Sequence, residues 1–197
     1  MQIHFLCMNK RIIRIMGYFG ILSPILGFLM LFLSISYTPD YNITTQTLSE
    51  LGSGGFGAVL FNSGLLMAGA LMMLFSTGLW EMGKNDLKGI LGSMMYLAVS
   101  IIIVSLSLVT INVSPWHYYL SLLLFILIPL SMLTFSLHLL DIKLKMRAII
   151  GFISGAGSIF IWITGGPVNG VKELVSLIFL AIWQIPVGYW MINRSIE

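Results

Sequence analysis

Long apolar stretches alternate with short polar segments along the whole chain. Six of these stretches are long enough, or nearly so, to cross a bilayer as a helix, which takes about 20 apolar residues. They cover residues 15–37, 56–80, 89–109, 116–140, 148–163 and 174–192. The pattern predicts an all-α membrane protein in which residues 1–197 form a single domain, a bundle of six transmembrane helices.

The fifth stretch is the shortest, and it is rich in Gly and Ser. Small side chains allow the backbone of a neighbouring helix to approach closely. We therefore expect the helix at 148–163 to lie inside the bundle, with Gly155 packed against another helix. The alternative is a short, tilted helix on the lipid-facing side.

Composition supports a membrane protein. The chain is 58% hydrophobic and 9% charged, whereas soluble domains are roughly 25% charged, and its mean hydropathy is +0.99. These values exclude a soluble enzyme, a disordered tail and a nucleic-acid binder. The single cysteine, Cys7, excludes a disulfide scaffold and a Cys-based zinc site. We expect the lipid bilayer as a partner and a multi-pass position in the cell membrane, whereas the oligomeric state is undefined.

Lys and Arg are distributed very unevenly between the two sets of connecting segments. Segments 1–14, 81–88, 141–147 and 193–197 hold nine of them, and the opposite set holds only Lys172. Because cytoplasmic loops are enriched in Lys and Arg, the split predicts that both termini are cytoplasmic. A cleaved signal peptide is the competing interpretation of the first stretch, but its apolar region is longer than the 7–15 residues typical of such signals.

Each helix that returns from the outer side begins near an ionisable residue: Glu50, His117 and Glu173. If the second, fourth and sixth helices converge, these three side chains lie together at an outward-facing cavity. We take them as candidate catalytic residues, and we predict no metal site. The candidate ligand-binding residues are Ser49, beside Glu50, and two deeper amides, Asn62 and Gln184.

Structural roles compete with each of these assignments. Acidic residues in a first helical turn complement the helix dipole, and Thr47 with Glu50 fits a capping box. The two deeper amides can equally form hydrogen bonds between helices. Capping does not explain His117, whose cationic form the dipole disfavours. We expect a neutral imidazole there, unless two carboxylates within about 4–6 Å keep it charged.

Two further features could belong to a functional site, but a structural interpretation is favoured for both. Ser114 followed by Pro115 is typical of a helix start, with Ser114 as the N-cap. His138 and Asp141 share a helix face and could bind a metal. Since three basic residues follow them at once, a rim that contacts anionic lipid is the favoured interpretation.

The first outer loop resembles domain-of-unknown-function family 998, a family of six-span membrane proteins from archaea and bacteria. The resemblance lies in Pro39-Asp40-Tyr41-Asn42, in the segment from Thr47 to Gly52, and in Phe61-Asn62-Ser63-Gly64. The family usually has Asp at the position of Glu50, and its pattern also matches His117 and Glu173. An Arg commonly follows the latter acid, where this chain has Leu174. The resemblance implies the six-span architecture and supports the outer cluster, but it implies no activity.

The sequence therefore predicts an uncharacterised integral membrane protein whose outward-facing polar site binds a small or amphiphilic ligand or permits transport. One alternative is an intramembrane lipid-modifying or hydrolytic enzyme that uses His117 with Glu50 or Glu173. Another is a structural or accessory subunit. The chain contains no HExxH, GxSxG or Walker motif, and the sequence leaves the cofactor unknown.

Overall fold

The computed structural model describes residues 9–193. Six helices in this range are long and apolar enough to cross a membrane, which confirms the predicted spans. They are α1 (Lys10–Ser36), α2 (Gly55–Gly83), α3 (Leu87–Leu108), α4 (Trp116–Asp141), α5 (Lys145–Ile163) and α6 (Gly170–Asn193). Cys7, Arg194 and both chain ends lie outside the described residues, so the location of the termini stays a prediction.

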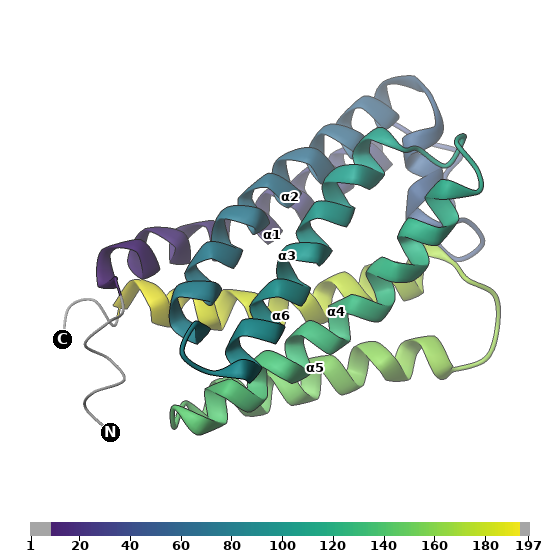
Figure 1. Ribbon diagram of the computed structural model, residues 1–197. Coiled ribbons are helices and arrows are strands. Elements are labelled where there is room, and N and C mark those ends of the chain that lie inside the picture. Colours follow the sequence, from purple (N-terminus) through teal and green to yellow (C-terminus); the bar gives the residue numbers. More distant parts are fainter. Residues whose placement is uncertain (1–8, 194–197) are drawn as a thin grey trace.

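The six helices form a ring in chain order. Each helix packs on the next, α6 closes the ring on α1, and α4 also contacts α6 (Figure 1). Glycine makes the closure possible, because a Cβ on Gly17 would lie 2.7 Å from the carbonyl oxygen of Gly188. We call the two ends of the ring the His117 end, with loops 37–54, 109–115 and 164–169, and the His138 end, with turns 84–86 and 142–144.

Helix α5 belongs to the ring rather than to its interior. The prediction for Gly155 is confirmed, since a Cβ there would lie 2.7 Å from Cγ of Leu133 on α4. The opposite face of α5, however, carries Ile153 and Phe160, which are 64% and 62% exposed. Small residues therefore bring one face of α5 onto its neighbours, while branched and aromatic residues leave the other face available to lipid.

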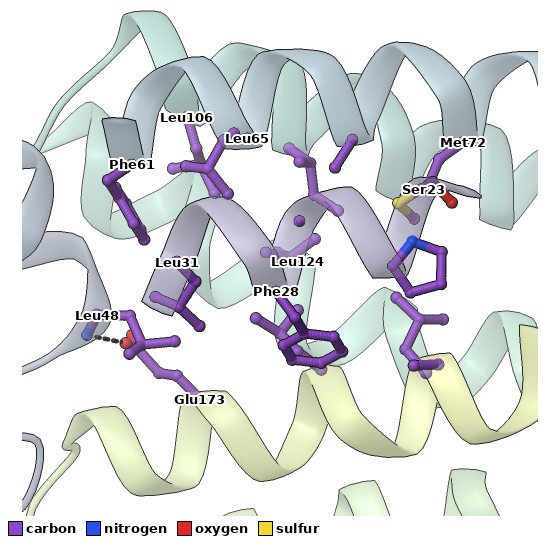
Figure 2. Close-up of a pocket in the computed structure, with 18 of the residues that line it drawn as sticks. Ser23, Phe28, Leu31, Leu48, Phe61, Leu65, Met72, Leu106, Leu124 and Glu173 are labelled. Atoms are coloured by element: carbon purple, nitrogen blue, oxygen red, sulfur yellow. Dashed lines mark hydrogen bonds between the residues drawn. The ribbon is translucent and has the colours of Figure 1, made fainter. Parts of the chain in front are cut away.

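A separate short helix, η2 (Leu48–Ser53), precedes α2. The capping box of Thr47 and Glu50 is present, but it begins η2 and not the second long helix, because η2 ends before Gly54 and α2 begins at Gly55. Gly55 has a φ of 73°, a conformation that favours glycine. Two leucines of η2 belong to a small apolar cluster that comprises Leu31, Leu48, Leu51 and Phe61. Figure 2 labels three of these residues, Leu31, Leu48 and Phe61. Thus η2 packs onto the His117 end of the ring.

Candidate functional site

Two cavities share a wall at the His117 end. The central cavity, of about 110 Å³, lies within the ring and is lined from α1, η2, α2, α3, α4 and α6 (Figure 2). The second, of about 540 Å³, is a groove between α4 and α5. Five residues line both of them: Ser49, His117, Ser121, Phe125 and Glu173. The common wall thus contains two of the three ionisable residues predicted from the sequence.

His117 lies in the first turn of α4 and is only 8% exposed. Its Nδ1 is 2.6 Å from the carbonyl oxygen of Val109. Because a carbonyl only accepts hydrogen bonds, Nδ1 carries the hydrogen, and Nε2 has a free lone pair when the ring is neutral. Within residues 9–193, Nε2 is buried and has no hydrogen-bond partner. A neutral His117 therefore presents a hydrogen-bond acceptor in the common wall.

Ser121 follows His117 by one helical turn, so both side chains lie on the same face of α4. Its Oγ is also buried and finds no hydrogen-bond partner in the described part of the chain. Sequence reasoning missed this residue, although its spacing from His117 was a usable signal. A hydroxyl and an imidazole nitrogen, each unsatisfied, are thus present together in the wall shared by the two cavities.

Glu173 joins α6 to η2. The side chain is 5% exposed, and its Oε2 accepts a hydrogen bond of 2.5 Å from the backbone N–H of Leu48 (Figure 2). The neighbouring N–H of Ser49 faces the same carboxyl group. Asn169 caps α6 by accepting from the N–H of Lys172. Glu173 therefore bonds to a different element, instead of capping its own helix.

Glu50 caps η2 instead of entering the shared wall. Its Oε1 accepts from the N–H of Thr47 at 2.9 Å, and its Oε2 accepts from Nε2 of Gln46 at 3.1 Å. The hydrogen bond from the N–H of Thr47 is thus the one that the capping interpretation predicts for Glu50.

Burial raises the pKa of Tyr41, and the charges of Glu173 and Glu50 raise it further. Tyr41 therefore stays neutral near both acids, and sequence reasoning gave it no role.

The start of α4 differs from the prediction. The residue before the helix is Pro115, and no side chain caps the first turn, so the expected N-cap role of Ser114 is wrong. The N–H of His117 instead donates to the carbonyl oxygen of Val113. Loop 109–115 thus holds His117 by its backbone and by its ring.

Lys172 does not pair with the acids of this end. Its Nζ donates to three backbone carbonyls that follow α5, at 2.7 Å to Thr164 and at 3.3 Å to Gly165 and to Gly166. No other Lys or Arg occurs in residues 37–54, 109–115 and 164–173. The charge of Lys172 is thus engaged at the C-terminal end of α5.

At the opposite end of α4, His138 and Asp141 have different partners. Nδ1 of His138 lies 2.9 Å from Oδ2 of Asp86, whereas Asp141 pairs with Lys88 at 2.6 Å. Between residues 9 and 193, no three His, Cys, Asp or Glu side chains are grouped as a metal ion would require. The two residues therefore act as separate ties between α4 and the α2–α3 turn region.

The sequence matches the family described as "Protein of unknown function (DUF998)" over residues 21–189. The chain belongs to the DUF998 family. No curated protein and no solved structure matches the chain. The matched range includes both cavities and all six predicted site residues.

Both deeper amides of this DUF998 protein bond to other helices. Gln184 is 1% exposed; its Nε2 donates to the carbonyl of Gly20 at 2.9 Å and to Oγ of Ser23, and its Oε1 accepts from Tyr96. It thereby links α1, α3 and α6, and it also lines the central cavity. Asn62 donates to the carbonyl of Gly52 at 3.3 Å, which ties α2 to η2.

Proposed function

We propose that this DUF998 protein binds an amphiphilic, lipid-like ligand in the groove between α4 and α5. The polar head lies at His117, Ser121 and Glu173, and the apolar chain extends along the groove toward the middle of the membrane. The observation that carries the proposal is the position of unsatisfied buried polar atoms at one end of an otherwise apolar groove.

The polarity of the groove changes along α4. Its wall begins with His117 and Ser121 and continues with Leu122, Ile126 and Leu130. The facing wall on α5 contains Ile159 and Ile163. An amphiphile has the same order of polar and apolar parts, so it satisfies the polar atoms and the apolar surface together.

The size of the groove supports a lipid-like ligand. Its volume of about 540 Å³ lies within the usual range of ligand pockets. Residues 117–130 of α4 span about 20 Å along the helix axis, whereas one leaflet contributes roughly 15 Å of hydrocarbon. Leu122 and Ile126 are about half exposed. The groove thus has the length of one leaflet and is open toward it.

The charge distribution supports an orientation for the site. Nine of the ten Lys and Arg residues belong to the His138 end and the chain termini. By the positive-inside rule, that end is cytoplasmic, and the His117 end faces outward. The ligand's head then lies at the outer surface of the cell membrane.

Substitution of Ile159 by Trp tests the proposal, because an indole at this position fills the groove. The purified protein is titrated with tritiated oleyl alcohol, oleate and oleyl phosphate in detergent micelles. We expect saturable binding of at least one of them by the unchanged protein, and a loss of affinity of about tenfold in Ile159→Trp.

The matched control is Ile153→Trp, which places the same indole on the lipid-facing side of α5 and should leave binding unchanged. Absence of saturable binding of all three amphiphiles to the unchanged protein would contradict the proposal. Equal binding by Ile159→Trp and Ile153→Trp would contradict it as well.

One observation favours a second candidate, a lipid-modifying enzyme. With Nδ1 of His117 bonded to Val109, Nε2 is the nitrogen that can remove a proton from a ligand hydroxyl. The binding experiment separates the two functions when the bound amphiphile is extracted and weighed by mass spectrometry. An unchanged mass supports binding alone, and a changed mass that requires His117 supports the enzyme.

A further inference from the structure

We infer that the head of the ligand is an uncharged hydroxyl group, as in a long-chain alcohol or a monoacylglycerol. The inference rests on the proposed function and adds the chemical class of the head. It follows from the hydrogen-bonding atoms that the groove leaves unsatisfied and from the charges near them.

Nε2 of His117 requires a hydrogen-bond donor on the ligand. Since its Nδ1–H is engaged by Val109, Nε2 can only accept a hydrogen bond while the ring is neutral. A ligand carbonyl, ester or ether oxygen accepts as well, so none of these groups can satisfy it. A hydroxyl group donates one hydrogen bond and thereby meets the need of this nitrogen.

Ser121 can complete the same interaction. A hydroxyl group that donates to Nε2 of His117 still has lone pairs that accept a hydrogen bond. Oγ of Ser121, one turn further along the same helix face, can donate to them. One hydroxyl head thus satisfies the two side-chain atoms that line the groove without partners.

The charges near the groove disfavour an anionic head. Burying a phosphate or a carboxylate is costly unless a cation accompanies it. Lys172, the one Lys or Arg in the loops of this end, donates to three carbonyls after α5. The carboxyl group of Glu173 lines the groove together with His117. An anionic head would therefore lie beside the carboxyl group of Glu173 and the lone pair of Nε2 of His117, and neither group attracts an anion.

An ammonium head has donors but loses more hydration than a hydroxyl when it is buried. Glu173 can offset part of this cost, but the N–H groups of Leu48 and Ser49 already share the charge of its carboxyl group. The hydroxyl is the head that fills the unsatisfied positions without burying a new charge.

The test compares heads on one chain. Oleyl alcohol, oleate, oleyl phosphate and oleylamine compete for the full-length protein with tritiated oleyl alcohol, at matched mole fractions in the micelle and at neutral pH. We expect oleyl alcohol to compete at concentrations about tenfold lower than those of the three charged amphiphiles. Equal or tighter binding of any charged amphiphile would overturn the inference.

His117→Asn separates recognition of the head from folding. The shorter Asn amide can still donate to the carbonyl of Val109 but presents nothing in place of Nε2. We expect its melting temperature to stay near that of the unchanged protein, while its affinity for oleyl alcohol falls about tenfold and that for oleate does not change. Preserved preference for the alcohol in this variant would overturn the inference.

The two proposals fail in different ways. If no amphiphile binds, or if Ile159→Trp has no effect on binding, the groove itself is not the site. The other outcome is that the amphiphiles bind, that Ile159→Trp lowers the affinity for all of them, and that the head group does not change the affinity. The groove is then the binding site, and the assignment of a hydroxyl head is wrong.

Discussion

The two histidines at opposite ends of α4 have opposite surroundings. Both are buried, both use Nδ1 in a hydrogen bond, and neither Nε2 has a partner in residues 9–193. Nδ1 of His117 meets a neutral carbonyl, and its ring lines two cavities. Nδ1 of His138 meets the carboxylate of Asp86, and its ring packs edge-on against Phe135. The same side chain thus lies in a hollow at one end and in a packed core at the other.

The partners explain the difference in role. Asp86 also caps α3 by accepting from the N–H of Gly89, so His138 ties α4 to the start of another helix. The neighbouring pair of Lys88 and Asp141 makes a second tie between the same helices. Within residues 9–193, the ring and the N–H of His117 bond to the loop just before its own helix. Its ring is positioned without joining distant parts of the chain, which suits a side chain that contacts a ligand.

The largest effect that we predict is on stability, from one substitution made at both ends. His138→Phe removes the bond to a carboxylate and should lower the free energy of unfolding by about 2–3 kcal/mol. His117→Phe removes a bond to a carbonyl and should cost about 1 kcal/mol. Denaturant unfolding in detergent measures both values. If His117→Phe is the more destabilising variant, the assignment of the two roles must be reversed.

A smaller effect concerns the pH dependence of the tie at the His138 end. Partial burial raises the pKa of Asp86, but hydrogen bonds from His138 and from the N–H of Gly89 outweigh it and lower the pKa. A carboxyl group with a lowered folded-state pKa stabilises the fold above its unfolded value of about 3.9. This contribution is lost as the pH falls through the folded-state pKa.

Asp86→Asn should therefore cost about 1–2 kcal/mol at neutral pH. The difference from the unchanged protein should shrink as the pH falls below about 4. Unfolding curves at a series of pH values measure it. A difference that stays constant across this range would show that the charge of Asp86 contributes nothing to the tie.

Much of the architecture was predictable because the apolar length of a span is a property of a continuous segment. The six helices and the close packing at Gly155 followed from such local signals. The short helix η2 was not predicted, because the apolar stretch that predicts α2 begins only at residue 56, after η2 has ended. Glu50 was predicted near the start of the second long helix, whereas it lies in η2 and accepts from the N–H of Thr47 there.

The candidate site was predictable only in part, because its contacts join distant segments. His117 and Glu173 were found as rare ionisable residues near the starts of apolar stretches. The bond from Leu48 to Glu173 spans 125 residues, and that between Asp86 and His138 spans 52. Spacing along the sequence does not predict contacts between residues so far apart. Ser121 was the exception, since it lies one helical turn from His117 and could have been included.

The most direct test of the binding groove is photo-cross-linking with oleyl alcohol that carries a diazirine near the end of its chain. We expect peptide mapping to find the label on residues 122–130 of α4 and 159–163 of α5. We also expect excess unlabelled oleyl alcohol and Ile159→Trp each to remove the label. Labelling spread over the lipid-facing surfaces of α1 and α2, and unaffected by Ile159→Trp, would contradict the proposed binding groove.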